Sequence, residues 1–246
     1  MKIAVPLKQV PDLVEDLEVA ASGTALDFDG LKMKLNEFDE HALEEALLLK
    51  EASGAEVVAL AIAGAEADRM LFTALAKGAD KAVKVSGVDA NADNHALAQA
   101  FAAAIGPLGA DLILTGVQSA SDRDGQLAPL LAARLGLPCV SVVTGVQPQG
   151  KAVLLKKEYS GGVMAEFEAD LPVVLGIQAA RQTPRYAPVS KVRQVQQSAK
   201  LEDFAASGGA APSQVVKMAP PPRGQGCKML KSADELLAVL KEKGVV

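Results

Sequence analysis

A regular alternation of strand and helix signals over the first 145 residues limits the folds open to this chain. Short apolar runs of strand character are separated by single segments with helical apolar spacing. Because single helices between strands favour right-handed crossovers, the pattern predicts an α/β fold with a parallel open sheet and flanking helices. The strands are expected at 2–7, 56–63, 80–85, 111–116 and 138–143, and the helices at 37–52, 65–77, 92–106 and 126–135.

The pattern changes after the fifth predicted strand. Residues 151–159 and 163–172 alternate apolar and polar side chains around Ser160-Gly161-Gly162, which predicts an antiparallel β-hairpin. A further apolar strand is expected at 172–178. No linker separates these strands from the preceding ones, so residues 1–197 are assigned to one α/β domain.

Residues 198–246 differ in composition and are expected to form an extended C-terminal arm. Ala, Gly and Pro dominate at 205–214 and 218–226, so these stretches bury too little apolar surface to fold alone. An amphipathic helix is expected at 231–244, with Ser232 as its N-cap. This helix could fold back on its own domain or dock on a partner subunit, and we assign it to the partner.

Composition and charge exclude several classes of function. Half of the residues are hydrophobic and the net charge is −5, without the basic stripe and interleaved aromatics of a nucleic-acid-binding surface. The apolar runs fall short of the roughly 18 residues that span a bilayer, and the N-terminal run is too short for a signal peptide. We therefore expect no membrane insertion and a cytoplasmic location. Cys139, Cys227, His41 and His95 lack ligand spacing, so no metal site is expected.

The segment NEFDEHALEEALLLKE at 36–51 carries a strong helix start signal. Asn36 can act as the N-cap, and Glu37, Asp39 and Glu40 place negative charge at the positive end of the helix dipole. Phe38 is unusual, because aromatic residues make up only 3% of this chain. It either fixes the helix entry through a staple contact or contacts a ligand.

Open parallel sheets bind ligands beyond the carboxyl ends of their strands, where the strand order switches direction. For a strand order of 3-2-1-4-5, segments 6–9 and 116–118 emerge at that point, followed by a loop at 119–129. The backbone N–H groups near Gly125 then suit an anion, although Asp122 and Asp124 oppose one and a solvated polar loop is the alternative.

Several familiar site signatures are missing from the sequence. There is no GxGxxG or Walker-type phosphate loop, and no GxSxG, HExxH or kinase motif. The paired carboxylates Glu44 and Glu45 are expected to be solvated on a helix face. These observations predict a binding or carrier subunit with no catalytic residues of its own.

Several short motifs occur in an order that is similar to that of the electron transfer flavoprotein β subunits. Each motif is weak alone, but their order and spacing extend over nearly the whole chain. The motifs are Lys8 and Pro11-Asp12, residues 36–46, TALAKGADKAVKV at 73–85, Gly116 with Gln118, Glu158 before Gly161-Gly162, LPVV at 171–174, and Pro184-Arg185-Tyr186.

The resemblance implies an adenine-nucleotide-hydrolase-like α/β fold and a heterodimer with an α subunit. It also implies an FAD shared with that α subunit and a structural AMP in this chain. Phe38 would lie against the dimethylbenzene edge of the flavin. The cofactor contacts implied by position are Pro6, Asn36, Glu37, Phe38, Asp39, Ala63, Gly116, Val117, Gln118, Asp122, Asp124, Gly125 and Gln126.

The resemblance further implies a segment that docks on flavin dehydrogenases. Its residues would be Pro184, Arg185, Tyr186, Val189 and Lys191, with Val189 where the family commonly has a leucine. The loss of one methylene there is worth roughly 0.8 kcal/mol if the side chain is buried. Glu158 would help to hold the mobile FAD domain of the α subunit.

The phosphate loop departs from the family pattern, which places Asp-x-Asp-Thr before its Gln. Here residues 122–126 read Asp-Arg-Asp-Gly-Gln, without the threonine hydroxyl and with the acids shifted by one position. This difference leaves the implied phosphate contacts open.

Three functions follow from these observations. The first is a carrier subunit that takes electrons from flavin dehydrogenases to a quinone reductase or similar acceptor. The second is an electron-bifurcating subunit with a second FAD in place of AMP and NADH as donor, for which Pro6, Ala63 and Val117 are small enough to leave space. The third is a stand-alone nucleotide-binding regulatory module. The tethered terminal helix and residues 183–188 speak against that third function.

Overall fold

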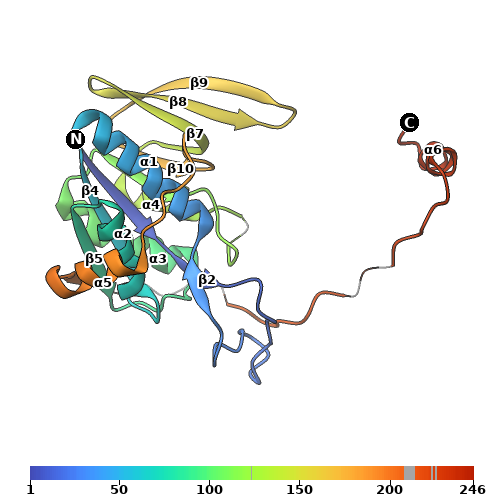
Figure 1. The fold of residues 1–246 in the computed structure, drawn as a ribbon, viewed down its shortest axis with the longest axis horizontal. Helices are drawn as coiled ribbons and strands as arrows, with labels where there is room; N and C mark the ends of the chain where they lie inside the picture. The colour runs from blue at the N-terminus through green and yellow to red at the C-terminus, as the bar shows by residue number, and fades with distance from the viewer. Residues whose placement is uncertain (123, 208–213, 223, 225) are drawn as a thin grey trace.

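The computed structural model describes residues 1–122, 124–207, 214–222, 224 and 226–246 (Figure 1). Its centre is a nine-stranded sheet that is parallel from its first edge strand to its seventh strand and antiparallel beyond that. The predicted parallel open sheet with an added hairpin is confirmed. In spatial order the strands are β11 (Glu202–Ala205), β5 (Lys81–Ser86), β4 (Glu56–Ile62), β1 (Lys2–Leu7), β6 (Leu112–Gly116), β10 (Val173–Ile177), β7 (Cys139–Gln149), β8 (Ala152–Tyr159) and β9 (Val163–Asp170).

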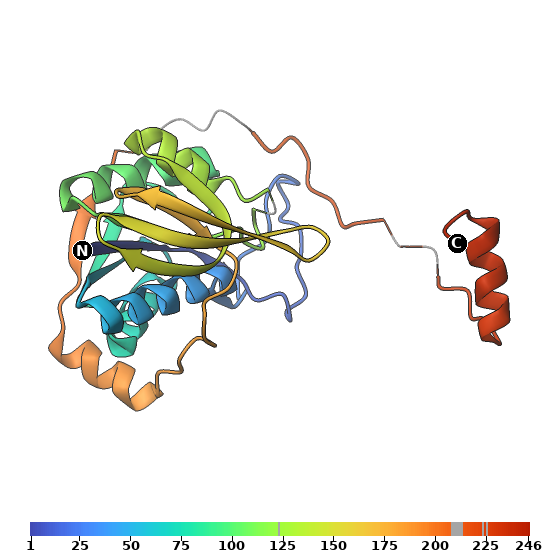
Figure 2. The same ribbon diagram turned by 90° about the horizontal axis from the view of Figure 1, so that it is seen from above.

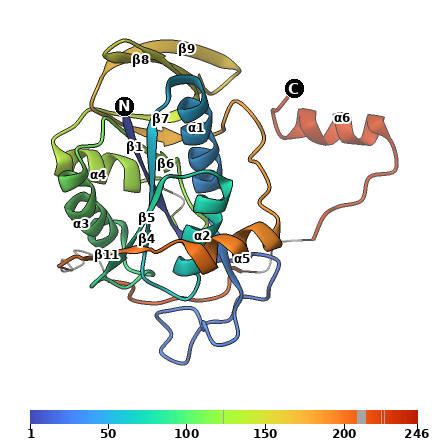
Figure 3. The ribbon, with the colours of Figure 1, turned by 60° about the vertical axis from the view of Figure 1, so that its left-hand side comes forward.

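Helices cover both faces of the sheet, which gives three layers (Figure 3). Each face has its own apolar core, because strands buried on both sides must be covered twice. One core contains Leu43 and Leu71, and the other contains Phe101 and Leu131. On the first face lie α1 (Glu37–Ser53) and α2 (Ala67–Lys77), with α5 (Val189–Ser198) packed beside α2; on the second lie α3 (Asn94–Ile105), the 3₁₀ turn Gly106–Leu108 and α4 (Leu127–Leu135).

The helix boundaries follow local chemistry. α1 ends at Gly54 and α4 at Gly136, both in the left-handed region with φ of 69° and 67°. Glycine favours this conformation because it carries no Cβ. In the last helix, α6 (Ala233–Glu242), the Ser232 hydroxyl accepts a hydrogen bond from Glu235 N at 3.2 Å. The predicted cap at Ser232 is therefore confirmed.

The five strands expected first keep the order 3-2-1-4-5, but an additional strand, β10, is inserted between the fourth and the fifth. β10 lies between β6 and β7, where Val173 N donates to Asp111 O and Val174 N to Pro138 O. All five residues of β10 are buried, whereas most of β7 is partly exposed. A strand that is apolar throughout belongs in the sheet interior, so β10 takes the central position and β7 carries the antiparallel hairpin. Figure 2 shows the β8–β9 turn projecting beyond the body.

The arm begins within the sheet. β11 pairs in parallel with β5, so residues 202–205 form an edge strand although they follow the proposed boundary at residue 197. Farther along, α6 lies away from the body in all three views (Figures 1, 2 and 3). Residues 208–213, 223 and 225 of the predicted extended stretches lie outside the described residues. The division into a domain and an arm stays a proposal.

Candidate functional site

The direction of strand order switches between β1 and β6, and the carboxylate of Asp39 lies at that point. β1 and β6 pair only at Ile3–Leu112 and Ala4–Ile113, after which their carboxyl ends separate. Asp39, from the first turn of α1, accepts hydrogen bonds from Lys8 N and Gly116 N, both at 2.8 Å. One side chain therefore joins the ends of both strands to the helix.

This arrangement leaves Asp39 buried and tightly surrounded. Burial raises the pKa of Asp39 to about 6, against the opposing effect of hydrogen bonds from Lys8 N and Gly116 N. Burial also lowers the pKa of the nearby Lys8. A Cβ on Gly116 would lie 2.5 Å from Asp39 Oδ1 and 2.7 Å from Phe38 Cβ. Glycine is therefore required where the helix approaches β6.

Asn36 does not cap α1 through its side chain, which corrects the predicted role. Its Nδ2 donates to Gln118 O at 2.9 Å, and its backbone N–H donates to Lys8 O at 2.9 Å. The loops after β1 and β6 offer these buried carbonyls, which need donors. Asn36 and Asp39 together fix the geometry of the switch point.

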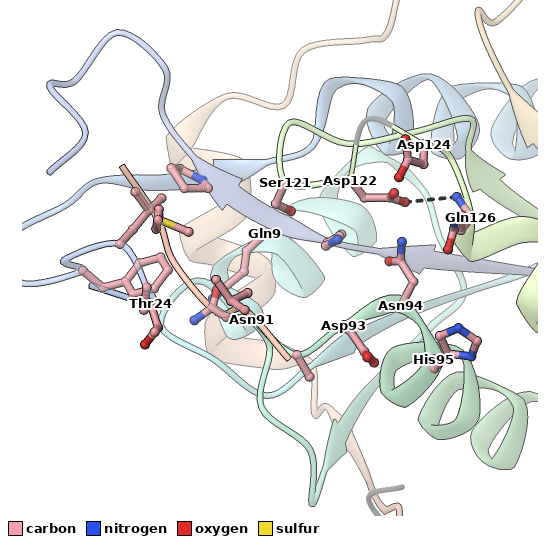
Figure 4. A pocket seen from close by; sticks show the side chains of 18 residues that line it. Gln9, Thr24, Asn91, Asp93, Asn94, His95, Ser121, Asp122, Asp124 and Gln126 are labelled. Carbon is pink, nitrogen blue, oxygen red and sulfur yellow. Dashed lines mark hydrogen bonds between the residues drawn. The ribbon is translucent and has the colours of Figure 1, made fainter. Parts of the chain in front are cut away.

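A cavity of about 640 Å³ opens beside this point (Figure 4). Its walls come from loops that follow β1, β5 and β6, from residues 24–28, and from Val215 and Met218 of the arm. Asn94 points from the start of α3 toward Asp122 and Gln126 at the start of α4 (Figure 4). Its Oδ1 is buried and has no hydrogen-bond partner among the described residues. A buried acceptor of this kind suits a ligand that donates a hydrogen bond.

Part of the predicted cofactor set comes together here. Asp122, Asp124 and Gln126 line the cavity. Asn36, Asp39, Gly116 and Gln118 line a small adjoining space that shares Lys8 and Asp122 with the cavity. Among the described residues, neither lining includes Pro6, Glu37, Phe38, Ala63, Val117 or Gly125. Arg123, inside the predicted phosphate loop, lies outside the described residues.

Sequence reasoning missed several residues of the cavity wall. Lys8 and Gln9 were placed at the switch point but were not assigned to the site. The loop at 91–95 follows β5 at the same edge of the sheet, and this position was the signal that could have identified it. Thr24 and Met218 also line the cavity, but they lie in segments whose sequence has no pattern that predicts a ligand site.

Glu44 and Glu45 are buried, with 2% and 0% exposure, and are not solvated as expected. Their charges are compensated by two arginines far along the chain. Arg185 Nη2 lies 2.8 Å from Glu44 Oε1, and Arg181 Nε lies 2.7 Å from Glu45 Oε1. Charged groups are buried when such partners are available.

The predicted docking and latch residues lie away from the cavity. Tyr186 and Val189 are 80% and 60% exposed, and Lys191 is also exposed. Pro184 is partly buried before the anchored Arg185. Glu158 is exposed near the end of β8. These positions leave the side chains available to a partner.

The described part of the chain contains no group of three or more His, Cys, Asp or Glu side chains that could hold a metal ion. Cys139 and Cys227 are free thiols. Across the same residues, helices are too short or too polar to cross a membrane.

Fold and cavity together define an α/β protein with a ligand site beyond the carboxyl ends of its strands. Residues 24–208 match the family model described as the electron transfer flavoprotein domain. The chain belongs to the electron transfer flavoprotein β-subunit family. The resemblance found in the sequence is therefore confirmed. Members are electron-carrier subunits that bind flavin or nucleotide and pair with an α subunit.

Three relatives illustrate the match. The chain is 34% identical over 199 residues to an electron transfer flavoprotein subunit beta from Methylophilus methylotrophus, covering 79% of this chain and 75% of that protein. It is 30% identical over 251 residues to a subunit of the same name from Bradyrhizobium diazoefficiens, covering both chains fully. It is 33% identical over 197 residues to the acryloyl-CoA reductase electron transfer subunit gamma from Anaerotignum propionicum, covering 78% of this chain and 73% of that protein.

Proposed function

We propose that this chain is the β half of a heterodimer that carries electrons from flavin dehydrogenases to a quinone reductase or similar acceptor. An FAD shared with the α subunit supplies the redox chemistry when bound, and this chain holds a structural AMP. The observation that carries the proposal is the cavity at the switch point, in a chain that belongs to the electron transfer flavoprotein β-subunit family.

The residues of the cavity fit an adenine nucleotide in two respects. The volume of about 640 Å³ lies within the roughly 300–1,000 Å³ of ligand pockets. The unpartnered Asn94 Oδ1 suits an amino or hydroxyl donor. Lys8 would face the phosphate and offset the charges of Asp122 and Asp124, which share the cavity. The protein would bind and orient the nucleotide and exclude water from it, without itself making or breaking bonds.

The remaining assigned residues would serve contacts outside the cavity. Phe38 is partly buried at the start of α1, a position from which it would form a wall for the shared flavin. Glu158 would hold the mobile domain of the α subunit. Pro6, Glu37, Ala63, Val117 and Gly125 complete the proposed cofactor contacts. We also propose a cytoplasmic location.

An electron-bifurcating subunit is the second candidate. A second FAD would replace AMP, and NADH would be the donor. The cavity of about 640 Å³ lies within the roughly 300–1,000 Å³ range of ligand pockets, so its size fits this candidate as well as the first. A stand-alone regulatory module has no comparable support, because the family match spans residues 24–208.

Counting nucleotides tests both candidates. The purified heterodimer is denatured, and its released nucleotides are separated by chromatography and quantified. One FAD and one AMP per heterodimer support the carrier, whereas two FAD and no AMP support the bifurcating subunit. A preparation that forms no heterodimer and releases no flavin overturns both.

The docking segment, residues 184–191, has its own test. Val189→Ala removes exposed apolar surface that a dehydrogenase would bury. Two buried carbons are worth roughly 1.6 kcal/mol, so the apparent KM for this protein in dehydrogenase assays should rise about tenfold or more. FAD content should stay unchanged. Loss of FAD without a change in KM would overturn the docking assignment.

A further inference from the structure

One face of α1 binds the irregular segment that leads from β10 to α5. Residues 178–188 cross beside α1 on their way to α5 (Figures 1 and 3). His41, Glu44 and Glu45 are three and four residues apart and therefore share a helix face. His41 Nδ1 accepts from Ala180 N at 3.2 Å. Glu51 lies about two turns beyond Glu44 and Glu45. These four side chains form what we call the α1 acceptor face.

Glu44 makes the most extensive of these contacts. Its carboxylate accepts from the backbone N–H of Arg185 at 2.9 Å, from Nε at 3.0 Å and from Nη2 at 2.8 Å. Arg185 Nη1 also donates to Glu51 Oε1 at 2.6 Å. The hydrogen bonds that Arg185 donates to Glu44 and Glu51 raise the pKa of Arg185 further above its usual range. A planar guanidinium held by this many acceptors has one orientation.

Glu45 fixes the preceding part of the segment. Its Oε2 accepts from Arg181 N at 3.1 Å, and its Oε1 accepts from Arg181 Nε at 2.7 Å and from Val146 N at 3.2 Å. Backbone N–H groups that would pair with a neighbouring strand in a sheet are here satisfied by helix side chains. The segment is thus held at two arginines four residues apart.

This attachment determines where the docking segment is presented. Tyr186 follows Arg185 directly and is 80% exposed, and Val189 begins α5 at 60% exposure. The Glu44 side chain is only 3% exposed. An unpaired carboxylate at such a position is strongly unfavourable, so the contact with Arg185 is hard to break while the chain stays folded.

The same helix also carries the proposed flavin wall. Phe38 lies six residues before Glu44, a rise of about 9 Å along the helix axis. One rigid element thus connects the first turn at the switch point with the anchored docking segment. The spacing between a docked dehydrogenase and the cofactor would be set by α1.

We propose that Glu44 is a positioning residue for electron transfer, holding residues 184–189 through Arg185 in the conformation that a dehydrogenase binds. The inference rests on the proposed docking function of this segment. It assigns Glu44 no contact with the cofactor or with the dehydrogenase. Its effect is confined to how well the partner binds.

The test compares variants of the intact heterodimer in steady-state transfer from a flavin dehydrogenase. Glu44→Gln should raise the apparent KM for this protein at least about tenfold, with kcat at saturation and FAD content unchanged. Arg185→Lys keeps the charge without the planar fork and should raise KM by a smaller factor. Glu56→Gln is the matched control, because Glu56 pairs with Lys2 and Lys81 away from this segment and should leave KM unchanged.

Each outcome separates the inference from the proposed function. If Val189→Ala raises KM and Glu44→Gln does not, the positioning role is wrong and the docking segment stands. If neither variant changes KM, the docking function itself fails. A fall in kcat or in FAD content equal to the rise in KM would make Glu44 a general structural residue. If Glu44→Gln does not fold, Glu44→Asp takes its place, because it keeps the charge and withdraws the carboxylate from Arg185. An unchanged KM for Glu44→Asp overturns the inference, and a raised one supports it.

Discussion

The carboxylate of Asp39 occupies the position at the switch point that many α/β proteins leave free for a phosphate. Its two oxygens accept hydrogen bonds from Lys8 N and Gly116 N, which lie where the ends of β1 and β6 separate. A phosphate therefore cannot take these donors without displacing Asp39. This explains how the chain can lack a glycine-rich phosphate loop after β1 and still have a cavity beside it.

The buried Asp39 gives a prediction about pH. Its pKa is raised from 3.8 to about 6, so the folded state binds more protons than the unfolded state between these values. The unfolding free energy should therefore fall as pH rises from about 4 to about 6, by on the order of 2–3 kcal/mol. Asp39→Asn removes this titration. Urea unfolding gives the unfolding free energy of the wild type minus that of the variant. This difference should fall between about pH 4 and about pH 6 and stay constant above that.

Asp12, which is partly buried and pairs with Lys32 and Lys34, provides the contrast. Hydrogen bonding to Lys34 lowers the pKa of Asp12, so its contribution to stability should be present above its ordinary pKa and lost as pH falls below it. For Asp12→Asn, the stability difference between wild type and variant should consequently rise, rather than fall, as pH increases. A stability difference for Asp39→Asn that is independent of pH would contradict the burial argument.

Gly116 gives a prediction about close packing. In Gly116→Ala the new methyl would lie 2.5 Å from Asp39 Oδ1, so the first turn of α1 must shift. We expect a loss of about 1–3 kcal/mol in unfolding free energy. Gly106→Ala is the control, because a Cβ there meets nothing within 4 Å and its φ of −50° is helical. Equal stabilities for the two variants would show that the helix start is not tightly packed.

At this scale the sequence predicted residue types better than residue roles. Asn36 and Asp39 were correctly placed at a helix start, yet their side chains bind strand ends that lie far away in the sequence. Glu44 was expected in solvent because its partner Arg185 follows 141 residues later. Such pairings depend on tertiary contacts that no local pattern encodes.

At the scale of helices and strands, the sequence predicted where an element begins and ends better than which strands lie beside each other in the sheet. The helix expected at 37–52 is Glu37–Ser53, because charge, apolar spacing and a terminal glycine are all local. β10 was recognised as a strand, but its insertion between β6 and β7 was not. Strand order depends on competition between strands for the buried centre of the sheet.

The arm segment at 214–218 is an element whose contribution to the site can be measured. Met218 N donates to Gly23 O at 2.7 Å, and the side chains of Val215 and Met218 line the cavity. Met218→Ala keeps the backbone contact and removes part of the cavity wall. Nucleotide should dissociate about fourfold faster or more, the factor expected for one buried methylene.

A neighbouring residue supplies the control for Met218. Val216 is 90% exposed and is not part of the cavity wall, so Val216→Ala should leave nucleotide dissociation unchanged. Release of the bound nucleotide from the purified heterodimer can be followed by competition with labelled AMP. Equal rates for both variants would mean that the arm does not close the site.

Viewed as a whole, the molecule combines a folded body with a helix that the body leaves uncovered. α6 lies away from the body in every view, and Leu236 and Leu237 are 46% and 48% exposed (Figure 2). The sequence predicted this helix from its cap and apolar stripe. Its assignment to a partner subunit stays a prediction, because an amphipathic pattern is the same whichever surface it covers. The proposed α subunit is the natural occupant.

Assembly of the heterodimer gives the last prediction. Leu240 lies at the centre of the apolar stripe of α6, and Ala238 lies on the opposite face. Leu240→Asp should weaken binding of the α subunit by tenfold or more, about 1.4 kcal/mol, without changing thermal unfolding of the body. Ala238→Asp adds the same charge to the same turn and should bind normally. If both variants bind the α subunit with native affinity, measured by titration calorimetry, the helix does not dock there and the arm has another partner.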